Sequence, residues 1–314
     1  MKWIVKKISA MLITLFLVTV VTFLAFEVIA GNGAISKLGM DASEEQIEAL
    51  KEELGMNKSL PVRYGEWLGK AVTGDFGISY QYNIPTTQLV GERMKVTVGL
   101  GLVAIVLILV ISIPLGLFVS KHEGGIWDHL ITTINQIAMS IPHFFLGMLI
   151  CLLFGVLLKW FIPGAYVPAS QGFDRYLGYI IYPAVAIALP KIAMVVKYLR
   201  TSVVRQMKMD YVRTARGKGC SENQILYHHV LKNALIPVIT FMAMMIADVL
   251  AGSLVIEPVF SLPGIGRLLV VSVANRDYPV VQLIVLYIAT LVVVLNGTVD
   301  ILYQVLDPRV KETV

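Results

Sequence analysis

Long apolar runs, separated by polar and charged stretches, make up most of this chain. The hydrocarbon core of a bilayer is about 30 Å thick, and a helix that rises 1.5 Å per residue crosses it with about 20 apolar residues. Six runs meet this requirement: 8–26, 97–119, 130–158, 177–199, 234–256 and 280–306. The pattern predicts an all-α integral membrane protein with six transmembrane helices.

The composition agrees with this prediction. Of the 314 residues, 57% are hydrophobic and only 15% are charged. A soluble domain of ordinary composition carries about 25% charged residues. The shortage of charge therefore excludes an ordinary soluble globular protein.

The placement of the charges predicts how the chain is oriented. Lys and Arg are enriched in loops on the cytoplasmic side, and the first seven residues contain three lysines. Alternating the spans from a cytoplasmic N-terminus places 205–232 and the C-terminal tail inside as well. Segments 27–96, 159–176 and 257–279 then lie outside, and 27–96 carries ten acidic residues against seven basic ones.

The first apolar run has a second possible interpretation, a cleaved signal peptide, because residues 28–30 before Gly31 resemble a cleavage site. The apolar part of a signal peptide is normally about 7–15 residues long. This run has 19 residues, which favours a retained transmembrane helix.

The polar stretch 31–96 is too long for a plain connector. Residues 43–46 (Ser-Glu-Glu-Gln) have the pattern of a capping box, and apolar residues follow at helical spacing as far as Leu54. We expect a short amphipathic helix there. Between Pro61 and Pro85, scattered Pro and Gly residues predict a compact looped region.

The stretch 205–232 concentrates positive charge more than any other part of the chain. It holds six Lys or Arg residues and two acidic ones, Asp210 and Glu222. The residues alone leave two interpretations open. The loop is a docking surface for a cytoplasmic partner, or its charges set the topology and attract anionic lipid, at about 1 kcal/mol per residue.

Ionisable residues inside the apolar runs need an explanation, since each costs at least about 2.5–3.5 kcal/mol near the bilayer centre. By helical rise, Asp248 lies about 22 Å from the inner surface and Lys191 about 13 Å less deep. We therefore expect these two residues not to pair. Asp248 either lines a translocation path or bonds to a neighbouring helix. Lys197, Arg200 and Asp300 form an expected cluster at the inner surface.

The sequence shows no pattern for a metal, a nucleotide or a catalytic site. His228 and His229 are adjacent, and neighbours on a helix do not face each other. Lys70 lacks the spacing of a phosphate-binding loop. Cys151 and Cys220 fall in an apolar run and in the basic stretch, so we expect no disulfide between them.

Several motifs, in this order along nearly the whole chain, resemble the permease subunits of ABC importers of the oligopeptide, dipeptide and nickel branch. The residues that carry the resemblance are 54–61, 74–79, 213–219 with 231–237, 257–267 with 275–279, and 300–303 with 307–309. The stretch 213–237 is similar to the cytoplasmic coupling motif of these permeases.

The resemblance implies a permease of the type I ABC-importer fold, with a small extracytoplasmic insertion after the first helix. It divides the chain into residues 1–30, the insertion 31–96 and a permease core 97–314, which contains the coupling loop 205–232 and an outer return loop 257–279. Residues 268–274 in that loop are too few to span, and we expect a re-entrant or surface helix.

The resemblance also implies partners: a second, homologous permease, two cytoplasmic ATPase subunits and an extracytoplasmic substrate-binding protein. In that assembly the ATPases bind ATP and Mg²⁺, and this chain has no cofactor, binds no nucleic acid and is not an enzyme. The residues expected to contact the ATPase are Arg213, Thr214, Ala215, Arg216, Lys218, Gly219 and Leu231. Those expected in the outer return loop are Glu257, Phe260, Pro263, Gly264, Gly266 and Arg267. Asp248 and Lys191 are candidates for the translocation path.

The function that the resemblance implies is import of oligopeptides or dipeptides across a bacterial or archaeal cytoplasmic membrane. The same machinery for nickel or oligosaccharides is an alternative. A secondary transporter or channel is an alternative of another class, but such proteins often contain internal repeats, and the sequence shows none.

Overall fold

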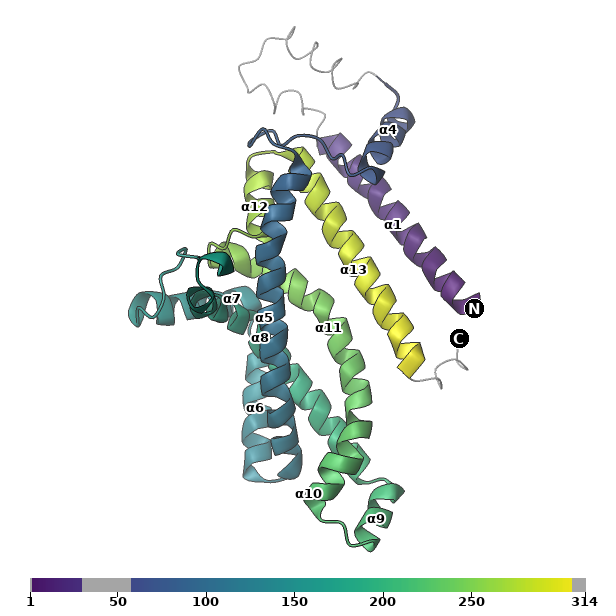
Figure 1. Ribbon diagram of the computed structural model, residues 1–314, viewed down its shortest axis with the longest axis vertical. Coiled ribbons are helices and arrows are strands. Elements are labelled where there is room, and N and C mark those ends of the chain that lie inside the picture. Colours follow the sequence, from purple (N-terminus) through teal and green to yellow (C-terminus); the bar gives the residue numbers. More distant parts are fainter. Residues whose placement is uncertain (1, 30–57, 307–314) are drawn as a thin grey trace. The chain divides into compact units, whose positions relative to one another are not determined.

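The structure is a computed structural model that describes residues 2–29 and 58–306 (Figure 1). Throughout these residues the chain is helical, apart from loops and one isolated β-bridge between Ile78 and Pro85. Three features predicted from the sequence lie outside the described residues: the amphipathic helix at 43–54, the last residue of the cleavage-like site at 28–30, and the motif at 307–309. The side chain of Asp300 is also outside them.

The chain folds into two compact units. The first comprises residues 1–96 and 263–297, and the second comprises 97–262 and 298–314. Helices in the first unit are α1 (Lys2–Ile29), α4 (Leu60–Val72) and α12 (Ile265–Ala274). Helices in the second are α6 (Ile126–Ser140), α7 (His143–Ile150), α8 (Phe173–Met207), α9 (Asp210–Gly217), α10 (Glu222–Gln224) and α11 (Leu231–Val259). Two long helices, α5 (Thr86–Lys121) and α13 (Tyr278–Leu306), contribute residues to both units.

Among the described residues, five helical stretches are long and apolar enough to cross a membrane. They are Val5–Phe26 in α1, α5, α8, the continuous stretch Glu222–Val259 that ends with α11, and Tyr278–Val299 in α13. These five confirm five of the six predicted spans. The fold is therefore that of an all-helical, multi-pass membrane protein.

The remaining predicted span, 130–158, is bent instead of straight. The chain bends by 100° between Ser140 and His143, so that α6 and the helical stretch from His143 to Leu157 form a bent pair that together is long and apolar enough for a sixth span. Pro142 explains the break, because proline pushes the residue before it out of the helical conformation. Ile141 accordingly has an extended backbone (φ −86°, ψ 123°). After α7 the chain continues in a π-helix, η2 (Cys151–Leu157).

Helix α8 is at the centre of the second unit, packed against α6, α7 and α11. Much of its length is buried, and many of the buried positions are small, such as Ala184, Ala186 and Ala188. In a membrane the hydrophobic effect does not drive helices together, and small residues allow the close packing that holds them instead. On α5, a Cβ atom at Gly116 would lie 2.8 Å from Cδ2 of Leu199, so this glycine is required for the contact with α8.

In the first unit, α4 packs against α1 through aromatic side chains. Tyr64 and Trp67 of α4 lie 5.4 and 5.7 Å from Phe23 of α1, measured between ring centroids. The Tyr64 hydroxyl is also 2.8 Å from that of Thr19. The predicted looped region is therefore wrong for residues 60–72. Pro61 lies in the first turn of α4, where a helix tolerates proline because no amide hydrogen is needed there.

Candidate functional site

The stretch 205–232 folds into a short helix, a tight turn and a second helical segment. Helix α9 ends at Gly217, and Gly219 follows with φ +83°. The Gly219 amide donates to the carbonyl of Arg216 (2.9 Å), and the Cys220 amide donates to that of Ala215 (3.2 Å). A glycine with positive φ after the last helical turn is the usual helix end of this kind. A Cβ atom at Gly219 would meet nothing within 4 Å, so the conformation, and not crowding within this chain, requires glycine.

The second segment of the loop begins at a capping box that the sequence analysis missed. The Ser221 amide donates to Oε1 of Gln224 (3.0 Å), and the Gln224 amide donates to Oγ of Ser221 (3.3 Å). The signal is legible in the sequence as Ser-x-x-Gln. The π-helix η4 (Ile225–Val230) and α11 follow without interruption, so the loop is joined rigidly to a membrane-spanning helix.

The loop has an apolar side that is buried in this chain and a polar side that is exposed. The buried residues are Val212, Ala215, Ile225, Leu226 and Val230. Ala215, expected to contact a partner, therefore packs mainly within its own chain. Arg213, Thr214, Arg216, Lys218 and Gly219 are exposed, and Leu231 is half-buried.

Arg216 already has a partner within the loop. Its Nε lies 2.6 Å from Oε1 of Glu222, and its Nη2 lies 3.0 Å from Oε2. This two-point hydrogen bond raises the pKa of the Arg216 guanidinium above its usual value. The pair joins α9 to α10 and balances one positive charge. This leaves Arg213 of α9, and Lys218 directly after it, as exposed cations without an ion pair among the described residues.

Lys191 and Asp248 form an ion pair between α8 and α11, contrary to the sequence-based expectation. The Lys191 Nζ lies 2.9 Å from Oδ2 of Asp248. The expectation was wrong because it placed the inner end of the fourth span near Lys197, whereas α8 continues to Met207. Lys191 is then about 24 Å from the end of α8, and Asp248 about 26 Å from the start of α11, so the two lie level.

The two members of this pair differ in exposure. The Lys191 side chain is 9% exposed, whereas that of Asp248 is 63% exposed. The Lys191 side chain is thus enclosed within the second unit, whereas the Asp248 carboxylate is partly exposed at its surface. A half-open carboxylate in the middle of an apolar helix must meet water or another polar group in the assembled protein.

His143, the first residue of α7, lies at the same junction of helices. A Cβ atom at Gly252 would lie 3.4 Å from Cδ2 of His143 and 3.7 Å from Cγ2 of Ile187. Gly252 is one helical turn from Asp248, and Ile187 is one turn from Lys191. The His143 Nδ1 is buried and makes no hydrogen bond among the described residues. His143 is an isolated ionisable residue in its apolar run, but the sequence alone gave it no role.

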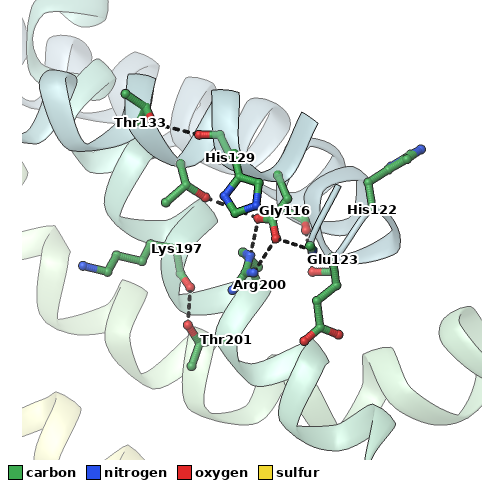
Figure 2. Close-up of polar contacts among 12 residues, drawn as sticks. Gly116, His122, Glu123, His129, Thr133, Lys197, Arg200 and Thr201 are labelled. Atoms are coloured by element: carbon green, nitrogen blue, oxygen red, sulfur yellow. Dashed lines mark hydrogen bonds and ion pairs between the residues drawn. The ribbon is translucent and has the colours of Figure 1, made fainter. Parts of the chain in front are cut away.

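A second ion pair joins α6 to α8 (Figure 2). Arg200 donates from Nε to Oδ1 of Asp128 (2.6 Å) and from Nη2 to Oδ2 (2.5 Å). Asp128 also accepts from the amide of Gly124 (2.8 Å) and from Oγ1 of Thr132 (3.3 Å), and it is 3% exposed. Asp128 is a partner of Arg200 that the sequence analysis missed, because it precedes the apolar run and looked solvated.

The return loop predicted at 257–279 begins later than predicted, because α11 continues to Val259. Glu257 is therefore a helical residue. It is fully buried, and its Oε1 accepts a 2.6 Å hydrogen bond from Oγ1 of Thr97 on α5. Phe260 follows, also fully buried, with its carbonyl bound by the hydroxyl of Tyr179 at 2.6 Å. These two residues fix the end of α11 in the second unit.

The remaining predicted residues of this loop are at the start of α12, in the first unit. Pro263, Gly264, Gly266 and Arg267 precede or open this helix, which spans Ile265–Ala274. The prediction of a helix too short to cross the membrane is confirmed. Pro263, Gly264 and Arg267 also line a pocket of about 350 Å³ with Tyr82 and Arg93.

A buried carboxylate holds the loop at residues 79–81 against the start of α13. Asp277 is fully buried and accepts from Oγ of Ser79 (2.5 Å), the amide of Tyr80 (3.0 Å) and the amide of Gln81 (3.4 Å). Burial and the charge of Asp277 raise the pKa of the Tyr80 phenol. The sequence analysis noted the motif around Asp277 but assigned this residue no role.

The described residues contain no group of three or more His, Cys, Asp or Glu side chains that could hold a metal ion. Cys151 and Cys220 are both free thiols.

An all-helical membrane protein with a basic, rigidly joined loop is the class that this structure defines. The sequence places it in a family. Residues 112–312 match the family of binding-protein-dependent transport system inner membrane components, and residues 1–101 match the N-terminal family of such membrane components. The chain belongs to this family, whose members are the non-catalytic membrane subunits of ABC transporters.

Relatives are similar over almost their whole length. The probable peptide ABC transporter permease y4tP of Sinorhizobium fredii is 31% identical, over 98% of this chain and 99% of the relative. The oligopeptide transport system permease AppB of Bacillus subtilis is 36% identical over 94% of both chains. The glutathione transport system permease GsiC of Escherichia coli is 33% identical over 99% of both.

Proposed function

We propose that this chain is one of two permease subunits of an ATP-driven importer for peptides. The observation that carries the proposal is its full-length similarity to permeases whose names specify peptides, oligopeptides and glutathione. A second, homologous permease, two cytoplasmic ATPases and an extracytoplasmic binding protein complete the importer. The ATPases supply the sites for ATP and Mg²⁺.

The orientation that we propose has both termini and the loop 205–232 in the cytoplasm. Its support is the charge distribution, with basic loops on one side and the acidic segment 27–96 on the other. In this orientation residues 31–96 are an extracytoplasmic insertion, and 97–314 form the permease core.

The exposed side of the loop 205–232 is, in this proposal, the surface that receives the ATPase. Arg213, Thr214 and Lys218 present hydrogen-bond donors on exposed side chains, and Leu231 is half-buried at the start of α11. Gly219 adopts the positive φ of the turn, and the buried Ala215 packs α9 against its own chain. Arg216 links α9 to α10 through its hydrogen bonds to Glu222. Because α10, η4 and α11 are continuous, a displacement of the loop would move a membrane-spanning helix.

Asp248 is our candidate for the wall of the translocation path, with Lys191 holding it in place. The support is the contrast between an exposed carboxylate and a buried ammonium at one level of the spans. On the outer side, we propose that Glu257 and Phe260 fix the end of α11. Pro263, Gly264, Gly266 and Arg267 then shape the return toward α12.

Nickel and oligosaccharides remain alternative cargoes for the same machinery. Among the described residues no cluster suits a metal ion, and the relatives reported above are named for peptides. Peptide import is therefore the function that the observations favour.

Purification and reconstitution test the proposal. A tagged form of this chain, extracted from its native membrane in mild detergent, is expected to copurify with an ATPase and a second permease. In proteoliposomes supplied with the binding protein, ATP on the ATPase side is expected to drive uptake of short labelled peptides. Uptake of Ni²⁺ or an oligosaccharide without any uptake of peptides would contradict the proposal.

A further inference from the structure

Two cavities flank the side chain of Lys197 in the second compact unit. One, of about 360 Å³, is lined by residues of α5, α6 and α8, and the other, of about 470 Å³, is lined by residues of α6, α8 and α11. Lys197 and Thr201, one turn apart on α8, line both. The two cavities are therefore adjacent, and the Lys197 side chain lines both of them.

The lining of both cavities is positively charged. Lys197 and Arg200 line the first, Lys197 and Arg205 line the second, and no acidic residue lines either. Arg200 is bound at two points to the buried carboxylate of Asp128, so its charge is balanced. Figure 2 shows the Lys197 side chain pointing away from that pair. No carboxylate among the described side chains lies within ion-pair distance of Lys197 or of Arg205, so these two are the unpaired charges of the two cavities, and Lys197 is the one that lines both.

Two amide side chains of α6 face the first cavity beside this lysine. Asn135 is 9% exposed and Gln136 is exposed, and both line the cavity. Neither amide group makes a hydrogen bond among the described residues. Each offers two N–H donors, and the lysine offers three. An ammonium and neutral N–H donors without a competing carboxylate suit an anion whose oxygens accept several hydrogen bonds.

Lys197 is exposed on the isolated chain, and its surroundings favour a polar contact over a lipid contact. Lys197 lies ten residues before the end of α8, which is about 15 Å of helix. An unpaired lysine turned to hydrocarbon is costly. Here Lys197 lies beside Asn135 and Gln136 in the lining of the first cavity and beside Thr201 in both. The polar face of α6 and α8 is therefore suited to water and a polar solute.

From these observations we infer that Lys197, together with Asn135 and Gln136, binds the terminal carboxylate of the transported peptide in the half of the path nearer the loop 205–232. The inference rests on the proposed function, because it requires a cargo with a free carboxylate. Asp128 has a positioning role. It binds the Arg200 guanidinium, which is then not available to the carboxylate of the peptide, and it joins α6 to α8. A phosphate of a lipid headgroup has similar chemistry, and the test separates the two sources.

Uptake of one peptide in two forms, with a free C-terminal carboxylate and with a C-terminal amide, tests the inference in the reconstituted importer. In Lys197→Gln we expect the maximal rate to fall about tenfold for the free acid, which corresponds to about 1.4 kcal/mol. The rate for the amide should stay within about twofold of the unsubstituted importer. Lys197→Arg should restore the free-acid rate. The binding protein is the same throughout, so its own preference cancels in these comparisons.

Arg175→Gln is the matched control, since Arg175 is an exposed cation of the same helix outside both cavities, and it should change neither rate. An equal loss of both peptides in Lys197→Gln would overturn the inference and show a structural role. A changed dependence on the fraction of anionic lipid, with the ratio of the two peptide rates unaltered, would overturn it in favour of a headgroup. If the unsubstituted importer took up neither peptide, the proposed function itself would fail.

Discussion

At the scale of single residues, the ion pair within the spans is asymmetric. Lys191 is almost fully enclosed, and Asp248 is mostly open on the isolated chain. Removing one partner of a buried pair is costly because it leaves the other charge unpaired, at about 3–5 kcal/mol. The penalty is therefore large when Lys191 is left without Asp248, and small when the exposed Asp248 is left without Lys191.

Two single variants should therefore differ in stability. Asp248→Asn strands the Lys191 ammonium and should lower the thermal unfolding midpoint of the purified complex markedly. Lys191→Met leaves an exposed carboxylate and should lower it less. The double variant should recover most of the loss. Equal losses in the two single variants, without recovery in the double one, would contradict the asymmetry.

The double variant also tests whether Asp248 lines the path, because its stability is largely restored. Reduced uptake of peptides by this variant would support a role in the path. Unchanged uptake would assign the pair to structure alone.

Single residues were the hardest features to predict from the sequence. Lys191 and Asp248 were identified because a charge stands out in an apolar run, but their pairing depended on where α8 ends. Asp128 and Asp277 lie outside the apolar runs, where a carboxylate usually faces solvent. Only the fold shows that both are buried and hydrogen-bonded.

At the scale of elements, apolar periodicity and length predicted five spans and the short helix α12. The same signal could not show the 100° bend in the third predicted span, because hydropathy carries no information on direction. Pro142 was the available clue. The helix α4 was missed since Pro61 was interpreted as a loop signal instead of a first-turn residue.

The loop 205–232 was recognisable in the sequence from its concentration of positive charge and from its similarity to a coupling motif. Two of its properties needed the structure. Ala215 packs within its own chain, and Arg216 is balanced by Glu222. The exposed cations of α9 are consequently fewer than the basic residues counted in the sequence.

At the scale of the whole molecule, family and fold class follow from the sequence, whereas the orientation in the membrane is a prediction from charge. In a chain with Cys151→Ser and Cys220→Ser, a membrane-impermeant maleimide added to right-side-out vesicles should label a cysteine introduced by Gln171→Cys. The same reagent should not label one introduced by Lys218→Cys. The reverse pattern would contradict the proposed orientation.

The most direct test of the central claim, that ATPase motion enters this permease through the loop 205–232, is peptide uptake by two substitutions at Gly219. Valine is strained at φ +83° by about 1–2 kcal/mol, whereas asparagine tolerates this conformation. A Cβ atom at this position would meet nothing within 4 Å in this chain. We expect Gly219→Val to insert normally but to lose ATP-driven uptake at least about tenfold, and Gly219→Asn to keep most of it. Normal uptake by a correctly inserted Gly219→Val permease would contradict the account.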